Sequence, residues 1–190
     1  MSPLFEAARD LQNLLDGWRW PFCIIGGIAL LRWGAPRYTR DVDVALLSGF
    51  GHEDDFTLPL LNSGYTGRIS HATEFARGNR VLLVTAPNGV PVDISLAALP
   101  FEEKAVQRAT MFEFAEGCSL RTCSAEDLLV MKLFALRPQD VADVESVAAL
   151  RGASLDWNYV EENLVPLAEA KEDSRIMAAF ADLHRRYGGR

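Results

Sequence analysis

The stretch Asp41-Val-Asp-Val-Ala-Leu46 alternates charged and apolar side chains at its start. In a β-strand, side chains two residues apart share a face, and neighbouring side chains point to opposite faces. The pattern therefore predicts a strand that buries Val42 and Val44. Asp41 and Asp43 then lie together on the other face, where their like charges repel each other unless a cation lies between them. This stretch therefore predicts both a strand of a β-sheet and a candidate metal site.

A strand, a glycine turn and a helix are predicted immediately before that stretch. Residues 22–25 form a short apolar run, Gly26 and Gly27 follow it, and residues 28–33 have the composition of a helix. Backbone N–H groups at the start of a helix attract phosphate, and glycine lets a phosphate approach closely. Gly26 and Gly27 are therefore candidates for seating a triphosphate.

A third acidic residue, Asp93, lies between Val92 and Ile94 in another predicted strand. Residues 80–85 and 90–94 flank an Asn-Gly pair at 88–89, which is a strong signal for a β-hairpin. If this strand pairs with the first acidic strand, the three carboxylates come together. Carboxylate oxygens suit Mg²⁺ or Mn²⁺, and three carboxylates can hold two such ions ~4 Å apart.

The remaining sequence predicts an α/β (α+β) fold: a small mixed sheet with flanking helices over residues 1–122, followed by a helical part over residues 123–190. Further short strands are predicted at residues 111–114 and 119–122. Helical periodicity covers residues 4–15, 53–62, 101–108, 124–136, 140–151, 157–170 and 173–187.

Composition and charge restrict the class of protein. The 190 residues are 49% hydrophobic and 24% charged, as in ordinary globular domains, and the formal net charge is -7. Such a charge argues against a protein that binds nucleic acid over its whole surface, so any nucleic-acid contact is local.

The odd number of cysteines, three, favours reduced thiols, and residues 1–20 are unlike a signal peptide. With no apolar stretch of the ~20 residues that span a bilayer, we expect a cytoplasmic protein without a membrane partner.

The order of these motifs resembles the polymerase-beta-type nucleotidyltransferase superfamily. The resemblance rests on Ile25-Gly26-Gly27, on Asp41 and Asp43 beside apolar residues, and on Asp93. Residues 37–43 and 124–143 resemble the branch that contains AbiEii-type toxins. The resemblance covers about residues 20 to 147, and it implies a nucleotidyltransferase fold.

The same resemblance implies roles for two residues of the helical part. In this branch, Lys132 and Asp140 correspond to a lysine and an aspartate near the active site, which provide a cation for the nucleotide phosphates and an acidic group near the acceptor. Without the resemblance, Lys132 would be interpreted as a solvated helix residue and Asp140 as a helix N-terminal charge. Arg37 and Arg40 flank the acidic pair, and either phosphate binding or pairing with a neighbouring carboxylate is compatible with their position.

Two positions depart from the family pattern. The superfamily often has serine where Gly27 stands, which removes a hydroxyl contact to phosphate. AbiEii-type toxins often have Lys-x-Asp at the third carboxylate, whereas Pro91 takes the place of that lysine. The second departure weakens a direct assignment as a toxin.

The functional hypothesis is an Mg²⁺-dependent (or Mn²⁺-dependent) transfer of NMP from an NTP to a hydroxyl group, with release of pyrophosphate. Asp41 and Asp43 would hold both ions, and Asp93 would complete the second site and help to deprotonate the acceptor. The acceptor is a tRNA end, a protein side chain or a small hydroxylated compound, and an antitoxin is a candidate partner. The alternative is a non-catalytic nucleotide- or metal-binding module on the same fold.

Overall fold

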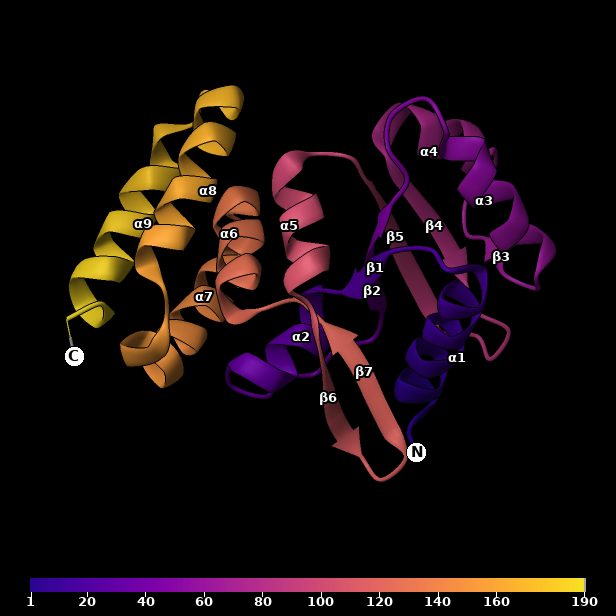
Figure 1. The fold of residues 1–190 in the computed structure, drawn as a ribbon, viewed down its shortest axis with the longest axis horizontal. Coiled ribbons are helices and arrows are strands. Elements are labelled where there is room, and N and C mark those ends of the chain that lie inside the picture. The colour runs from indigo at the N-terminus through magenta and orange to yellow at the C-terminus, as the bar shows by residue number, and fades with distance from the viewer. Residues whose placement is uncertain (190) are drawn as a thin grey trace. The chain divides into compact units, whose positions relative to one another are not determined.

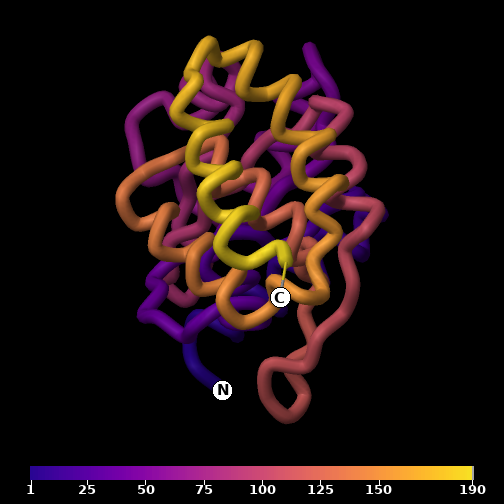
Figure 2. The backbone as a smooth tube through the Cα atoms, turned by 90° about the vertical axis from the view of Figure 1, so that its left-hand side faces the viewer, coloured from indigo at the N-terminus to yellow at the C-terminus, as the bar shows by residue number. Residues whose placement is uncertain are grey.

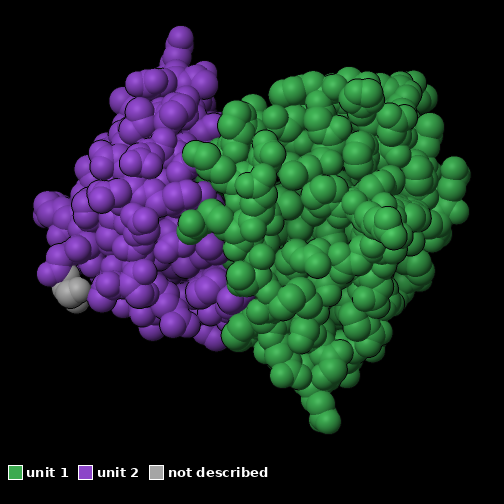
Figure 3. Space-filling view, in the orientation of Figure 1, with its two compact units in different colours: residues 1–28, 38–123 green, residues 29–37, 124–190 purple. Residues whose placement is uncertain are grey.

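The computed structural model describes residues 1–189, which divide into two compact units (Figures 1 and 3). Unit 1 comprises residues 1–28 and 38–123 and contains the β-sheet. Unit 2 comprises residues 29–37 and the chain from residue 124 onward, and it is helical. The predicted fold class, a mixed α/β sheet followed by a helical part, is confirmed.

The sheet of unit 1 has seven strands within the described residues, in the order β3-β4-β5-β2-β1-β7-β6. The pairs β2–β5 and β1–β7 are parallel, and the other neighbours are antiparallel. The strands are β1 (Phe22–Ile24), β2 (Val42–Leu47), β3 (Thr66–Gly67), β4 (Val81–Thr85), β5 (Pro91–Ala97), β6 (Thr110–Ala115) and β7 (Cys118–Thr122).

The hairpin between β4 and β5 forms as the Asn-Gly pair predicts. Gly89 adopts a left-handed conformation with φ 86°, which glycine reaches without steric cost. The Gly89 N–H donates to the Ala86 carbonyl at 2.9 Å, and the Ala86 N–H donates to the Val90 carbonyl at 2.8 Å. The resulting register places Asp93 directly opposite Leu83.

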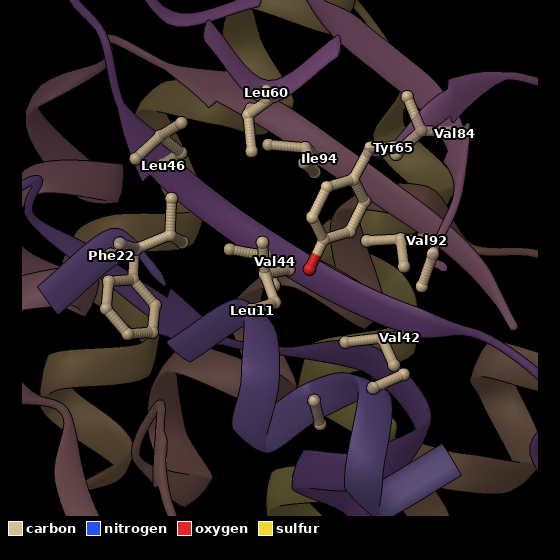
Figure 4. Close-up of a cluster of buried hydrophobic side chains, with 14 of the residues drawn as sticks. Leu11, Phe22, Val42, Val44, Leu46, Leu60, Tyr65, Val84, Val92 and Ile94 are labelled. Atoms are coloured by element: carbon tan, nitrogen blue, oxygen red, sulfur yellow. The ribbon is translucent and has the colours of Figure 1, made fainter. Parts of the chain in front are cut away.

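Three helices bury one face of the sheet: α1 (Pro3–Trp18), α3 (Glu53–Asn62) and α4 (Ala72–Asn79). Alternate residues of β2 and β5 supply the strand side of this core. Figure 4 shows these side chains meeting Leu11 from α1 and Leu60 from α3. The strand residues drawn in this core include Val42, Val44, Leu46, Val84, Val92 and Ile94.

The opposite face of the sheet is where the acidic residues lie. Helix α5 (Pro100–Arg108) contacts β1 and β2, where Cys23 and Ala45 are buried. Asp43 and Asp93 alternate with the buried residues of their strands, so their side chains point to this second face and stay half-exposed.

Unit 2 contains α6 (Ala125–Ala135), α7 (Pro138–Arg151), a short 3₁₀ turn (Gly152–Ser154), α8 (Trp157–Lys171) and α9 (Ser174–Tyr187). Helices α8 and α9 run side by side (Figures 1 and 2). Ser124 caps the N-terminus of α6, because its hydroxyl accepts a hydrogen bond from the Asp127 N–H at 3.1 Å. Among the described helices, none is both long enough and apolar enough to cross a membrane.

Helix α2 (Gly26–Trp33) connects the two units, since residues up to Ile28 belong to unit 1 and residues from Ala29 belong to unit 2. The sequence predicted a separate glycine turn followed by a helix from residue 28. Instead, Gly26 and Gly27 form the first positions of the helix itself, and Gly26 has φ 60°. The helix therefore begins at the glycines, with Gly26 in the left-handed conformation at its first position.

Candidate active site

The structure brings together the three carboxylates that the sequence predicts to share a site. Asp43 and Asp93 are direct partners in the register of the parallel strands β2 and β5, so their side chains lie on the same face. Asp41 immediately precedes β2. One carboxylate oxygen from each residue lies within 4.8 Å of the other two.

The donor set fits a hard divalent cation. All three groups are half-exposed carboxylates, and Mg²⁺ prefers oxygen ligands while keeping several of its waters. Three negative charges at this separation repel each other, so a bound cation would relieve their repulsion. Asp41, Asp43 and Asp93 are therefore the residues that could hold a metal.

A cation from the chain itself already contacts this cluster. The Arg68 guanidinium donates to Asp93 Oδ1 and forms an ion pair with it. Burial raises the pKa of the Asp93 carboxyl above its ordinary value, the Arg68 charge opposes that rise, and the Asp41 charge adds to it. Sequence reasoning missed Arg68, because the arginine lies 25 residues from Asp93 beside a strand of only two residues.

The two glycines fit tightly against the acidic cluster. A Cβ added to Gly26 would lie 1.9 Å from Asp43 Oδ2, and one added to Gly27 would lie 2.2 Å from Thr39 Oγ1. The Gly27 N–H donates to Asp43 Oδ2 at 3.4 Å, a long hydrogen bond. Glycine is therefore required at both positions by the close approach of neighbouring side chains.

Thr39 is a second residue of the site that sequence reasoning missed. Its hydroxyl donates to Asp41 Oδ1 at 3.2 Å and lies over Gly27. Such a hydrogen bond restricts the rotation of a ligating carboxylate and orients its remaining lone pairs. A signal was present in the sequence, because Thr39 stands two residues before Asp41 in the stretch that resembles the family.

The two arginines that flank the acidic pair have different surroundings. Arg37 belongs to unit 2, where its Nε and Nη2 donate to the two oxygens of Asp143 at 3.0 and 3.1 Å. Arg40 is exposed, and its guanidinium carbon lies 5.2 Å from the centroid of the Tyr38 ring. Of the two alternatives left open by the sequence, Arg37 thus has a carboxylate partner in this structure.

Lys132 and Asp140 lie together inside unit 2. The Lys132 side chain is only 7% exposed, and its Nζ donates to Asp140 Oδ1 at 3.1 Å and to Asp143 Oδ2 at 2.7 Å. Lys132 is therefore a buried cation between two carboxylates, not a solvated helix residue. Burial alone would raise the pKa of Asp140, but hydrogen bonds from Arg137 and Lys132 outweigh it, and the pKa falls below its ordinary value.

Several solved structures have a similar fold. An antigenic nucleotidyltransferase-like protein from Paracoccidioides brasiliensis is 20% identical, with 94% of this chain and 92% of that chain covered and a TM-score of 0.53. The antibiotic-resistance factor ANT(2'')-Ia is 19% identical, with 95% and 97% covered and a TM-score of 0.54. The lincosamide antibiotic adenylyltransferase LnuA, bound to lincomycin, is 13% identical, with 76% and 96% covered and a TM-score of 0.53. At these identities the similarity establishes the fold.

Family membership comes from the sequence. Comparison with curated proteins gives no match. The family described as "Nucleotidyl transferase AbiEii toxin, Type IV TA system" matches residues 9–173, which include the acidic cluster, both glycines and Lys132. Because this match covers most of the chain, the predicted resemblance is confirmed, and the protein belongs to the AbiEii family of nucleotidyltransferases.

Proposed function

We propose that the protein transfers an NMP group from an NTP to a hydroxyl group in a reaction that depends on a divalent metal ion. Nucleotidyl transfer is the activity that the family is named for. The observation that carries the metal-dependent reaction is the convergence of Asp41, Asp43 and Asp93 within 4.8 Å on one face of the sheet.

In the proposed mechanism, Asp41 and Asp43 hold the metal and Asp93 completes the site. A bound Mg²⁺ or Mn²⁺ would offset the carboxylate charges and stabilise the charge that develops on the phosphate oxygens. Asp93 accepts the proton of the acceptor hydroxyl. The hydroxyl oxygen then bonds to the α-phosphorus, the bond from that phosphorus to the bridging oxygen breaks, and pyrophosphate leaves.

We assign the seating of the triphosphate to the N-terminus of α2. The N–H groups of Gly26 and Gly27 lie at this helix end, next to the carboxylate of Asp43. The backbone N–H groups at the start of a helix and the helix dipole favour negative charge there. The absence of side chains on both glycines lets a phosphate approach the backbone closely.

Four further residues enter the proposal. Lys132 and Asp140 enter through the family resemblance, and Arg37 and Arg40 enter because they flank the acidic pair in the sequence. Lys132 and Arg37 are cations for the phosphates, Asp140 is an acidic group for the acceptor, and Arg40 is an exposed cation next to Asp41 in the sequence. The buried network of unit 2 supports a positional role, because it fixes the side chains of Lys132 and Asp140.

The acceptor class and the partner are proposed from the family and from the sequence. The family is described as a toxin of a toxin-antitoxin system. For such a toxin we propose a tRNA or a protein as the acceptor and an antitoxin as the partner. A small hydroxylated acceptor is the alternative, which the net charge of -7 favours slightly. The structure of LnuA with lincomycin bound is a precedent for such an acceptor on this fold. The use of an NTP is consistent with the cytoplasmic location expected from the sequence.

The test is transfer from each of the four α-³²P-labelled NTPs to total tRNA, purified protein, aminoglycosides or lincosamides. We expect one acceptor class to become labelled in the presence of Mg²⁺, and we expect Asp43→Ala and Asp93→Ala to abolish the labelling. Asp54→Ala is the matched control, since Asp54 pairs with Arg77 outside the cluster. Undiminished labelling by the two site variants contradicts the mechanism. Metal-dependent NTP binding without transfer to any acceptor supports the non-catalytic module instead.

A further inference from the structure

Arg68 lies at the end of a cross-strand row that leads to the acidic cluster. Its backbone N–H donates to the Leu83 carbonyl at 3.0 Å, which extends the pairing of β3 with β4 by one residue. Leu83 is the partner of Asp93 in the β4–β5 register, and Asp93 is the partner of Asp43 in the β5–β2 register. The Arg68 side chain thus reaches Asp93 from a fixed point on the backbone.

The ion pair between Arg68 and Asp93 occupies a group that the metal needs. Their side chains are 29% and 31% exposed, so the pair is partly shielded from water but not locked inside the protein. A guanidinium and a divalent cation both bind carboxylate oxygens, and they repel each other at short range. A metal bound at the cluster would therefore weaken the contact between Arg68 and Asp93.

Strand β5, which carries Asp93, contains no cationic side chain that could neutralise this carboxylate. Pro91, two residues before Asp93 on the same face of β5, is uncharged. Arg68 is the positive partner that the structure provides for Asp93, from another strand. Arginine also suits phosphate, because its planar fork forms two parallel hydrogen bonds to phosphate oxygens.

We propose that Arg68 is a positioning residue that alternates between Asp93 and the triphosphate. Before metal binds, Arg68 neutralises and orients Asp93. With a metal held by the carboxylates, the Arg68 guanidinium would leave Asp93 and donate hydrogen bonds to the phosphate oxygens of the incoming NTP. This inference rests on the proposed nucleotidyl transfer, and it adds a nucleotide contact from the β3–α4 segment that no sequence motif indicates.

The proposal predicts opposite effects on metal and nucleotide binding in one variant. Arg68→Gln removes the competing cation, so we expect its affinity for Mn²⁺ alone, measured by electron paramagnetic resonance titration, to rise by about two- to fivefold. Affinity for a non-hydrolysable α,β-methylene NTP analogue in saturating Mn²⁺ is expected to fall by about tenfold or more, because a charge-assisted hydrogen bond is lost. Arg68→Lys, which keeps the charge but not the fork, is expected to bind Mn²⁺ like the wild type and the analogue more weakly.

Arg77→Ala is the matched control, since it breaks another partly exposed Arg–Asp pair, with Asp54, and leaves the cluster untouched. Far-UV circular dichroism establishes that each variant is folded. The inference is overturned if Arg68→Gln binds Mn²⁺ no more tightly than the wild type, or if its affinity for the analogue is unchanged. If the wild type does not bind Mn²⁺, or if Asp43→Asn does not abolish that binding, the proposed metal site is wrong, and the role of Arg68 is wrong with it. If Asp43→Asn abolishes the Mn²⁺ binding of the wild type and Arg68→Gln leaves it unchanged, only the role of Arg68 is rejected.

Discussion

At the scale of single residues, the site is defined by close contacts between the acids and their neighbours. Alternation along the strand was enough to predict that Asp41 and Asp43 share a face. That Asp93 lies beside them depended on an assumed pairing of the two strands, which the β2–β5 register provides. The ion pair of Asp93 with Arg68 was beyond prediction, because it depends on pairing between segments far apart in sequence. The burial of Lys132 had a usable signal: residues 128–131 and 133 are all apolar, and a helix that is apolar all round is buried.

The contact between Gly26 and Asp43 yields a prediction. Gly26→Ala adds a Cβ that would lie 1.9 Å from Asp43 Oδ2, so the carboxylate must move. We expect the affinity for Mn²⁺ to fall by about tenfold or more, the scale of changes that disturb ligand orientation. The left-handed φ of 60° adds about 1–2 kcal/mol of destabilisation, which thermal unfolding measures.

Gly49→Ala separates the two effects of the Gly26 substitution. Gly49 has φ 69°, and an added Cβ would meet nothing within 4 Å. This variant should lose similar stability and keep its affinity for Mn²⁺. Equal Mn²⁺ affinity in the two alanine variants would contradict the role of the close contact at Gly26.

Thr39 yields a second residue-scale prediction. Thr39→Val keeps the shape of the side chain but removes the hydroxyl that donates to Asp41. We expect Mn²⁺ to bind about tenfold more weakly, because Asp41 loses its orienting partner. Thr39→Ser keeps the hydroxyl and should stay close to the wild type in the same titration. Wild-type affinity in Thr39→Val would show that Asp41 is held by other contacts.

At the scale of elements, the longer helices and the paired strands were predictable from periodicity and from the Asn-Gly turn. The helix α4 and the strand β3 were not predicted. β3 has only two residues, and α4 has eight, with Gly78 and Asn79 at its end, where helix propensity is poor. Tertiary contacts with β4 stabilise both elements, and a local sequence pattern does not record such contacts.

The buried network between α6 and α7 leads to a prediction about pH. Asp140→Asn leaves Lys132 with a weaker partner in a buried position, so we expect a loss of about 3 kcal/mol in the free energy of unfolding at pH 7. The lowered pKa of Asp140 means that its carboxylate stabilises the fold above the ordinary carboxyl value near 4. That contribution disappears as the pH falls below this value and through the lowered pKa of the folded state.

Urea unfolding of the wild type and Asp140→Asn between pH 2.5 and 7 measures this difference. The gap in stability should be largest above about pH 4 and should shrink at lower pH. Glu161→Gln, at an exposed position of α8, is the control and should not reproduce the trend. If the difference in the free energy of unfolding between the wild type and Asp140→Asn stays constant across this pH range, the buried network is not the cause of that difference.

At the scale of the whole molecule, each of the two units is built from two separate segments of the chain. Residues 29–37 group with the helices after residue 124. The Ala35 N–H donates to Ser146 Oγ at 3.2 Å, and Arg37 pairs with Asp143. Such contacts link residues more than 100 positions apart, so local periodicity cannot predict them. The domain boundary near residue 122, which rests on sequence alone, stays a prediction.

This arrangement predicts the behaviour of a fragment. A chain of residues 123–190 lacks the segment 29–37 and therefore loses both the Arg37–Asp143 pair and the hydrogen bond from the Ala35 N–H to Ser146 Oγ. We expect the fragment to unfold at a lower temperature than the helices of the whole protein, as followed by far-UV circular dichroism. The same unfolding temperature in both would show that residues 29–37 do not stabilise unit 2.

The central claim is that Asp41, Asp43 and Asp93 support transfer of a nucleotidyl group. The most direct measurement follows the same NTP labelled either at the α- or at the γ-phosphorus, incubated with the acceptor and Mg²⁺. We predict that the α-label enters the acceptor, that the γ-label leaves as pyrophosphate, and that Asp43→Asn abolishes both. Transfer of the γ-label to the acceptor, or undiminished transfer by Asp43→Asn, would contradict this account.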